Sequence, residues 1–354
     1  MHRQAMIIGG GVAGLAAAAA LGRDGWQVTV RERDGAPATA GTALGIWPAA
    51  LHALDALGAG DEVRRAGVPQ LAGRFLRPDG SRIAEIDVGR LHRRTGDHVH
   101  LLSRPPLLAI LQEAAIAAGA RIQRGDPVDG PEAGGADLLV VADGVFSRTR
   151  ERLFGPAYRA RYSGGTAWRG VVPDMPVDAF AEVWGRGVKF GVTPQEGGRT
   201  NWFATTAAPE GSFHPGAEVA VLRRTFGTWA APVAPVLDAI EESGVLRHDV
   251  YVTPPLPSYV SGAAVLIGDA AHAMSPDLGR GACEAIIDAV TLARCLRGAS
   301  AQAEGLQGYD RSRRRVTRRL SRVAAAAAGM TRVRRGLPFR DGLLRVGMLA
   351  GPPA

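Results

Sequence analysis

The chain has 354 residues, of which 46% are hydrophobic and 21% are charged. This composition is ordinary for a globular protein and excludes wholesale disorder, and the length suffices for about two domain-sized units. Two cysteines exclude a disulfide-rich scaffold. Cys283 and Cys295 fall in one predicted helix at a separation of about 18 Å, beyond disulfide reach. We therefore expect free thiols and a reducing, cytoplasmic location.

The net charge is +8, yet Lys189 is the single lysine and arginine carries the remaining positive charge. This bias is typical of a GC-rich genome and weakens any inference from basicity to nucleic acid. A charge of this size still favours anionic ligands. Residues 5–22 carry no charge and imitate a signal peptide or membrane span, but their glycines predict a buried strand followed by an alanine-rich helix.

The first half of the chain predicts alternating strands and helices. Apolar runs bounded by glycine and proline indicate the following elements: strands at 5–8, 27–30 and 137–142, and helices at 15–21, 49–57 and 105–118. The unbroken apolar strand at 137–142 is typical of a buried parallel sheet. Residues 69–96 read as short β-like pieces.

The texture changes between about 160 and 250. Aromatic-rich runs punctuated by glycine and proline predict an antiparallel sheet: 166–172, 182–192 and 199–205. A buried strand returns at 263–267, a helix with one apolar face follows at 281–296, and arginine-rich helices finish the chain from Tyr309.

A glycine motif lies between the first strand and the first helix. Gly9, Gly11 and Gly14 follow the G-x-G-x-x-G pattern, and Glu32 ends the next strand. In this context the pattern predicts a dinucleotide site, because the glycines allow a tight turn, approach of the pyrophosphate and close helix packing. The helix N-terminus would hold the phosphates, and Glu32 would accept the ribose hydroxyls. The motif alone fits NAD or FAD.

Two downstream segments resemble a known family. ADLLVVADGVFSRTR (136–150) and AAVLIGDAAHAMSPDLGRGACEAIIDA (263–289), with the glycine motif, resemble the three motifs of single-component, class A FAD-dependent monooxygenases. These include salicylate hydroxylase, 3-hydroxybenzoate 6-hydroxylase and zeaxanthin epoxidase. The resemblance covers nearly the whole chain, and further segments fall in family order: 41–58, 101–111, 184–194, 201–204 and 306–322.

The resemblance implies an α/β fold in which a Rossmann-like FAD-binding domain is interwoven with a smaller, mostly antiparallel β-sheet substrate domain, followed by C-terminal helices. We expect residues 1–70, 97–160 and 255–300 in the FAD-binding domain. Residues 71–96 and 161–254 would form the substrate domain, and 301–354 the C-terminal helical segment.

The resemblance also implies the residues that contact non-covalent FAD. The predicted set is Gly9, Gly11, Val12, Ala13, Gly14, Glu32, Arg33, Arg104, Asp143, Gly144, Asp269, Pro276, Gly279, Arg280, Gly281 and Ala282. Within it, Arg104 and Asp269 match family residues at the ribityl region of the flavin, and Asp143-Gly144 matches a motif associated with both FAD and the nicotinamide. Gly279 to Ala282 would lie beside the isoalloxazine ring, where helix N-terminal amides stabilise the reduced, anionic flavin.

The implied reaction is hydroxylation or epoxidation of an aromatic or other electron-rich small molecule, in secondary metabolism or aromatic catabolism. NAD(P)H would bind transiently, reduce FAD and leave, and O2 would then give a flavin C4a-hydroperoxide. No catalytic base is predicted. Two other functions stay open: an FAD-dependent dehydrogenase or reductase without oxygen insertion, and a non-catalytic flavin- or nucleic-acid-binding protein.

Candidate pocket residues come from the predicted sheet: Trp168, Arg169, Trp184, Phe190, Asn201, Trp202 and Phe203. Their aromatic rings suggest an aromatic or polycyclic substrate, although a domain core would need such rings equally. We expect no nucleic-acid partner and no integral membrane segment, and a monomer or homodimer.

Some residues depart from the family pattern. Gly279-Arg280-Gly281 stands where the family usually has Gly-Gln-Gly, Asp277 where it has asparagine, and Asn201 where relatives often carry tyrosine. We expect the Arg280 side chain to point to solvent. Alternatively its charge acts on the reduced flavin or pairs with an acidic substrate group.

Other polar residues favour structural roles. His98 and His100 lack a third ligand nearby, so we expect no metal site. His272 is expected to orient its loop rather than perform acid–base work. An arginine-rich stripe predicts a solvated helix face over the FAD-binding domain rather than a nucleic-acid surface: Arg311, Arg313, Arg314, Arg315, Arg318, Arg319 and Arg322.

Overall fold

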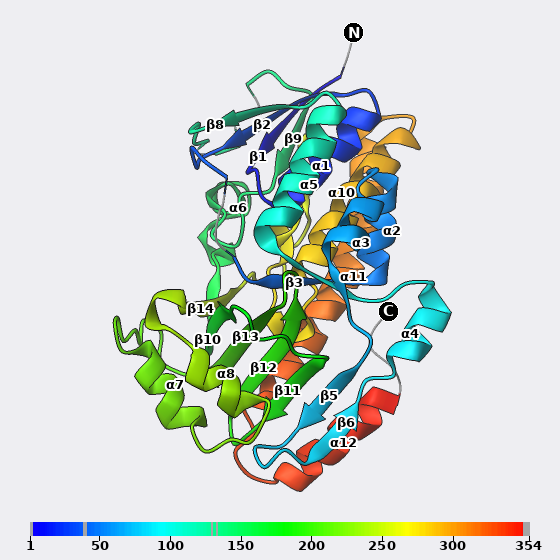
Figure 1. Cartoon of the computed structure of the whole chain (residues 1–354). Coiled ribbons are helices and arrows are strands. Elements are labelled where there is room, and N and C mark those ends of the chain that lie inside the picture. The colour runs from blue at the N-terminus through cyan, green and yellow to red at the C-terminus, as the bar shows by residue number, and fades with distance from the viewer. Residues whose placement is uncertain (1–2, 38–40, 129, 132–133, 350–354) are drawn as a thin grey trace.

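The computed structural model describes residues 3–37, 41–128, 130–131 and 134–349. Two large sheets lie one above the other along the molecule, and a long helix runs behind both (Figure 1). Segments of the chain alternate between the two sheets, so each is assembled from parts far apart in sequence.

The six-stranded sheet is almost entirely parallel. Its order is β15 (Val260–Ser261), β16 (Ala264–Leu266), β9 (Leu138–Val141), β1 (Gln4–Ile8), β2 (Gln27–Glu32) and β8 (Arg121–Arg124), and only the β15–β16 pair is antiparallel. The helices α1 (Val12–Arg23), α5 (Arg104–Ala117) and α10 (Gly281–Arg297) pack together beside it. Residues 16–19 of α1 are all alanine and have no exposed surface, because their small side chains let both neighbouring helices approach closely.

The seven-stranded sheet carries the smaller domain. Its order is β14 (Leu246–Val252), β10 (Arg161–Val172), β13 (Arg199–Ala207), β12 (Val188–Gln195), β11 (Phe180–Trp184), β5 (Gly73–Leu76) and β6 (Arg82–Glu85). All pairs are antiparallel except β11–β5. The helices α7 (Glu218–Phe226) and α8 (Val233–Ala239) contribute to a hydrophobic core with one face of this sheet. We call the opposite face the inner face.

Smaller elements join the two sheets. A three-stranded sheet contains β3 (Ala43–Ile46), β7 (His100–Ser103) and β4 (Val68–Pro69). The remaining short elements are α2 (Pro48–Ala56), α3 (Gly60–Ala66), α4 (Val88–Thr95), α6 (Arg148–Phe154), α9 (Asp269–His272), η1 (Pro156–Tyr158), η2 (Glu242–Gly244) and η3 (Pro276–Leu278).

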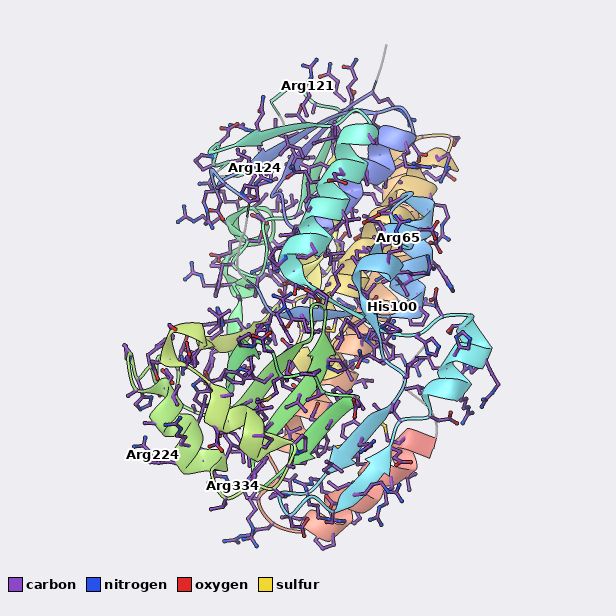
Figure 2. All side chains as sticks on the ribbon, viewed as in Figure 1. Arg65, His100, Arg121, Arg124, Arg224 and Arg334 are labelled. Atoms are coloured by element: carbon purple, nitrogen blue, oxygen red, sulfur yellow. The ribbon has the colours of Figure 1, made fainter. Side chains whose placement is uncertain are left out.

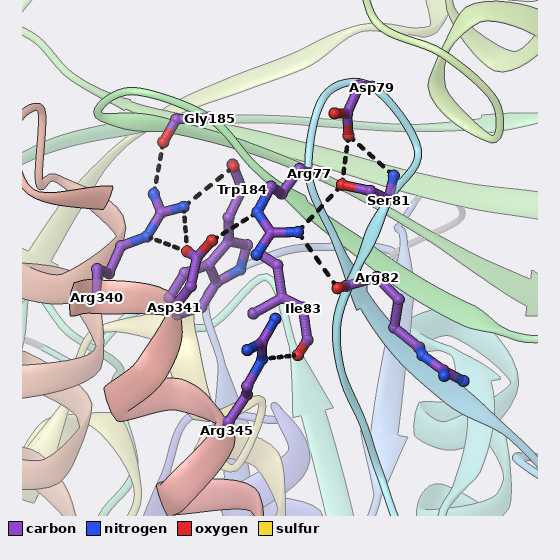
Figure 3. A network of polar contacts seen from close by, with 10 residues as sticks. All are labelled: Arg77, Asp79, Ser81, Arg82, Ile83, Trp184, Gly185, Arg340, Asp341 and Arg345. Atoms are coloured by element: carbon purple, nitrogen blue, oxygen red, sulfur yellow. Dashed lines mark hydrogen bonds and ion pairs between the residues drawn. The ribbon is translucent and has the colours of Figure 1, made fainter. Parts of the chain in front are cut away.

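Two helices end the described chain. α11 (Gln302–Thr331) spans both domains, and α12 (Leu337–Leu349) packs against β6 (Figure 1). Figure 3 shows how α12 is fixed: Arg340 donates to the carbonyl of Gly185 at 2.6 Å, and Arg345 donates to that of Ile83 at 2.8 Å. Asp341 accepts from Arg340 and from Arg77 of the sheet domain, at 2.7 and 2.8 Å. The buried carboxylate is thereby neutralised on both sides.

The predicted fold class is confirmed, with differences in detail. The helix α4 lies within the segment predicted as β-like pieces, and α7 and α8 lie within the segment predicted as sheet. Each is only seven to nine residues long, so its helical period extends over about two turns and is easily missed in the sequence. The domain boundaries stay a prediction. Both cysteines are free, as expected.

Basic side chains are spread over the molecule. The labelled residues Arg121, Arg224 and Arg334 lie on different parts of it (Figure 2). Among the helices that the structure describes, none combines the length and the apolar character needed to cross a bilayer. The longest described helix, α11, has 30 residues but carries the arginine-rich stripe.

Candidate functional site

The glycine motif forms a tight junction between β1 and α1. Gly9 has a φ of +103°, and a Cβ there would lie 2.4 Å from the carbonyl oxygen of Ala142. A Cβ on Gly14 would lie 1.9 Å from the carbonyl oxygen of Gly9. Both positions therefore require glycine for packing alone. Gly11 differs, because its backbone is extended and a Cβ would meet only Arg104, at 3.9 Å. The space above Gly11 is open.

Glu32 lies beside this junction. Its carboxylate accepts from the amide of Gly10 at 2.5 Å and from that of Asp34 at 2.9 Å. The neighbouring Arg33 is exposed and faces Asp34 at 3.4 Å. The end of β2 thus presents an oriented carboxylate next to the first amides of α1, Val12 and Ala13, whose N–H groups have no partner within the helix.

Asp143 follows β9 on the other side of the glycine motif. One carboxylate oxygen, Oδ2, accepts from the amide of Thr149 at 3.4 Å, whereas Oδ1 is buried without a hydrogen-bond partner. Gly144 has a φ of +83°, which suits glycine. A buried acceptor without a donor is rare, so Asp143 fits a site where a bound molecule donates.

Asp269 and Arg104 face a common space. Asp269 opens α9 and is exposed to solvent, although desolvation by the surrounding protein raises its pKa and the charges of His272 and Arg104 only partly oppose that rise. A carboxylate that is accessible to solvent although protein surrounds it on most sides lies at the wall of a cleft. A Cβ on Gly281 would lie 3.9 Å from Oδ1 of Asp269. Gly11, Arg104, Asp269 and Gly281 therefore form one continuous line from α1 to α10.

Arg150 ties two parts of this line together. Its guanidinium has no exposed surface and donates to the carbonyls of Val145, Tyr158 and Ala270 at 2.7, 2.8 and 3.0 Å. These carbonyls belong to the segment after Asp143 and to α9. The sequence prediction did not single out Arg150, because an arginine in an exposed-looking Arg-Thr-Arg stretch gives no signal of burial.

A buried ionic cluster supports the loop from α9 to α10. Asp288 accepts from Nε2 of His272 at 2.6 Å, from the amide of Gly268 at 2.8 Å and from Arg313 at 2.6 Å. Desolvation would raise the pKa of Asp288, but the charges of His272 and Arg313 outweigh it and lower that pKa to about 2. His272 is thus held in place between α9 and α10, in keeping with a positioning role.

Glu284 extends the cluster to Arg280. It lies 2.5 Å from Arg313 and 3.2 Å from Arg280. Arg280 is only 4% exposed, and its guanidinium lies 5.4 Å from the ring centroid of Trp47. The expectation that Arg280 points to solvent is wrong, because the side chain runs along the first turn of α10 to Glu284. The expectation of a solvated stripe is likewise wrong for Arg313, which is buried.

Lys189 fastens the inner face of the sheet to η3. It is 3% exposed and lies 2.9 Å from both Glu182 and Asp277. Desolvation raises the pKa of Asp277, but Lys189 outweighs it, so the net shift is downward. Lys189 was not among the predicted site residues. A lone lysine within an apolar strand was the available signal, since such a residue is rarely buried without an acid.

The strand register divides the predicted pocket residues between two faces. Trp168, Phe190 and Trp202 lie in the core cluster with Phe226 of α7. They are core residues, so the pocket prediction is wrong for them. Trp184 packs in a separate cluster with Leu344 of α12. Alternation along a strand sends every second side chain to the opposite face, and the aromatic composition could not reveal which.

Arg169, Asn201 and Phe203 lie on the inner face. The Oδ1 atom of Asn201 accepts from the amide of Ala43 in β3 at 3.1 Å. A Cβ on Gly191 would lie 2.1 Å from the ring of Phe203, so that ring covers the backbone of β12. The inner face therefore contacts β3 at Asn201 and η3 at Lys189, with Phe203 and Arg169 in the row of residues between them.

Other places in the fold are less suited to be the site. A cavity of about 690 Å³ lies beneath α12, lined in part by Trp184, Trp229 and Arg77, away from Gly11 and Asp269. His98 stacks on His92 at 4.3 Å. The described residues contain no group of three metal-ligating side chains.

Comparisons with known proteins agree with this geometry. The family model described as an FAD binding domain matches residues 2–324. Aurachin C monooxygenase/isomerase of Stigmatella aurantiaca is 37% identical over 82% of this chain and 80% of its own length. The 2-heptyl-3-hydroxy-4(1H)-quinolone synthase of Mycobacteroides abscessus is 30% identical over 88% of this chain and 86% of its own. The crystal structure of Klebsiella pneumoniae HpxO complexed with FAD and uric acid covers 99% of this chain and 97% of its own, with a TM-score of 0.85 and 27% identity.

The fold and the converging motifs define a flavoprotein, and the chain belongs to the FAD binding domain family. Within that family it is an FAD-dependent monooxygenase of the class A group. The residues present fit FAD: the orphaned oxygen of Asp143, the open space above Gly11 and the exposed Asp269 each leave room and partners for the cofactor.

Gly11 and Gly14 give contrasting predictions. Gly11→Val should leave the free energy of unfolding of the apoprotein within about 1 kcal/mol of wild type, because the backbone is extended and nothing is within 3.4 Å, while retention of FAD is lost. Gly14→Ala should destabilise the apoprotein itself, because two backbones must separate. Chemical denaturation and flavin absorbance measure the two effects. Full FAD occupancy in Gly11→Val would contradict the assignment.

Asp288 predicts acid sensitivity. Its pKa falls from an ordinary 3.8 to about 2, so its contribution to stability is present above pH 4 and is lost as the pH falls toward 2. We expect wild type to lose roughly 2 kcal/mol through this group. Asp288→Asn should cost roughly 3–5 kcal/mol at pH 7, because Arg313 loses a buried partner. Asp61→Asn, with an exposed carboxylate, is the control. Equal acid profiles for wild type and Asp288→Asn would refute the role.

Proposed function

We propose that FAD lies along the line from Gly11 past Arg104 to Asp269 and Gly281. The adenosine half would meet Glu32 and the amides of α1, where positive partial charge favours the pyrophosphate. Arg104 would face the phosphates and Asp269 the ribityl hydroxyls. The contact between Arg104 and the space above Gly11, which brings two distant motifs together, supports this placement.

The isoalloxazine ring would lie between the start of α10 and the inner face of the sheet. Bound FAD would supply the redox chemistry, accepting a hydride from NAD(P)H and then activating O2. The chain would orient it: the first amides of α10 would face the ring edge, while Lys189 holds η3 against the sheet and Asp288 holds His272 of α9. Only one dinucleotide motif is present, which supports transient binding of the nicotinamide.

The substrate would be a flat aromatic or heteroaromatic ring, seated on the ring of Phe203 across from the flavin. The relative named as a quinolone synthase and the structure of HpxO with uric acid support such a substrate, since quinolone and uric acid are both flat and bicyclic. Asn201 and Lys189 already hold protein partners, so they would border the ring rather than anchor it. The dryness of the buried inner face would protect the oxygen transfer from water.

Oxidation of NAD(P)H should report occupancy of this pocket. We expect slow oxidation by the FAD-loaded enzyme alone and at least a tenfold increase, of roughly 1.4 kcal/mol or more, when a substrate is bound. Stopped-flow reduction of the flavin, with urate and 4(1H)-quinolone as first trial substrates, measures it. Incorporation of ¹⁸O from labelled O2 into the product identifies oxygen insertion. Reduction rates that no turned-over substrate changes would contradict the proposal.

Arg280 gives a prediction for the flavin itself. Arg280→Gln removes a buried charge at the start of α10, so the two-electron reduction potential of bound FAD should fall by roughly tens of millivolts. Arg297→Gln, at the exposed far end of the same helix, is the control and should leave the potential unchanged. A potential that moves in neither variant would show that the charge of Arg280 acts on its protein partners and not on the flavin.

A further inference from the structure

Arg169 is an exception among the buried and half-buried cations that surround the proposed pocket. Lys189, Arg280 and Arg313 each pair with one or two carboxylates, and Arg150 donates to three carbonyls. Across the residues that the structure describes, the guanidinium of Arg169 has neither a hydrogen bond nor an ion pair. Only desolvation acts on its pKa, which it lowers.

The unpaired guanidinium of Arg169 costs free energy unless a bound molecule supplies its partner. A charged group that is removed from water without a partner costs several kcal/mol, and arginine cannot escape the cost by losing its proton. Arg169 is half-buried, so part of the residue remains accessible to solvent. The strand could carry an apolar residue here without such a cost. A half-buried guanidinium without a partner is therefore typical of a binding site rather than of a protein core.

The register places Arg169 within the proposed pocket. On the inner face it pairs with Phe203 of β13 and Leu246 of β14. Two residues further along the strands in one direction, the same face carries Lys189, which contacts Asp277 of η3. Two residues further in the other direction it carries Asn201, which contacts β3. Arg169 thus lies between the contacts that this sheet makes with β3 and with η3.

The neighbours of Arg169 leave its charge uncompensated. His248 is its diagonal neighbour on β14, and burial together with the charges of Arg169 and Arg247 lowers the pKa of His248. A neutral imidazole adds a hydrogen-bonding nitrogen without a charge. Phe203 supplies the flat surface beside the guanidinium. The local charge is positive, and the ring of Phe203 offers a flat surface with the guanidinium of Arg169 at its edge.

We propose that Arg169 is a specificity-determining residue that binds an anionic or strongly polarised oxygen substituent on the substrate ring while the ring lies on Phe203. The fork of N–H donors suits an enolate, a phenolate or a carboxylate, and binding would neutralise the charge that the protein leaves unpaired. This inference rests on the proposed function, which it narrows from a flat aromatic substrate to one that bears an acidic oxygen on or beside the ring.

The test uses FAD-loaded enzyme and two matched pairs of probes. Urate and 4(1H)-quinolone carry oxygen substituents on ring carbons, and purine and quinoline are the same skeletons without them. Perturbation of the flavin absorbance gives the Kd of each probe. The variants are Arg169→Met, Arg169→Lys and the control Arg161→Met, an exposed arginine of the same strand. We expect at least one oxygen-bearing probe to bind wild type.

The expected result is selective. Arg169→Met should weaken the oxygen-bearing probe by roughly 10- to 100-fold and the oxygen-free skeleton by less than about twofold. The loss of affinity in Arg169→Lys should lie between those of wild type and Arg169→Met, because lysine keeps the charge and lacks the forked N–H donors of the guanidinium. Arg161→Met should match wild type. Circular dichroism and FAD content, equal in all variants, would show that the fold is intact.

Several results would overturn the proposal. If Arg169→Met weakened the binding of both members of a pair equally, Arg169 would be a structural residue. If neither oxygen-bearing probe bound the wild-type enzyme, the proposed anion site would be refuted. A changed FAD affinity or KM for NAD(P)H, with unchanged probe Kd, would assign the guanidinium to a cofactor phosphate instead. Selective probe loss without any incorporation of labelled oxygen would support the anion site and refute the proposed reaction, so the two failures are distinguishable.

Discussion

The buried pairing of Asp288 with Arg313 is the contact on which the flavin side of the molecule depends. Asp288 belongs to α10 and Arg313 to α11, and the same carboxylate accepts from Gly268 and His272 at the end of the parallel sheet. Three elements that are distant in sequence therefore meet at one charge. Removing either partner would leave the other buried with part of its charge uncompensated, so the pairing also fixes where Asp269 and Arg280 can lie.

The parts of the site that could be predicted from sequence are those encoded locally. The glycine motif requires a strand, a tight turn and a helix in order, and each requirement is visible in the sequence around Gly9 to Gly14. The segments at 136–150 and 263–289 are similarly compact. Because the carboxyl ends of parallel strands meet at one edge, these local motifs converge without further information.

The parts that could not be predicted depend on long-range packing. Trp168 and Phe203 belong to paired strands with similar composition, yet one lies in the core and the other on the inner face. The choice depends on which face α7 and α8 cover, and those helices were not predicted. Burial of Arg150 was not predicted for the same reason: its partners are carbonyls contributed by packing, which leave no pattern around the arginine itself. Arg280 differs, because its partner Glu284 lies four residues further along the same helix.

One signal was nevertheless present. Ala285 and Leu292 mark the apolar face of α10, and helical spacing places Asp288 on that face between them. An acid on a buried face must find a cation, and the nearest supply is the arginine stripe of α11, which supplies Arg313. The same reasoning applied to Lys189 demands an acid on an adjacent element, which is Asp277. Applied to Arg169, it finds no acid among the described residues. The buried cations Lys189, Arg280 and Arg313 all have a carboxylate partner, so the missing partner of the half-buried Arg169 is best sought in the ligand.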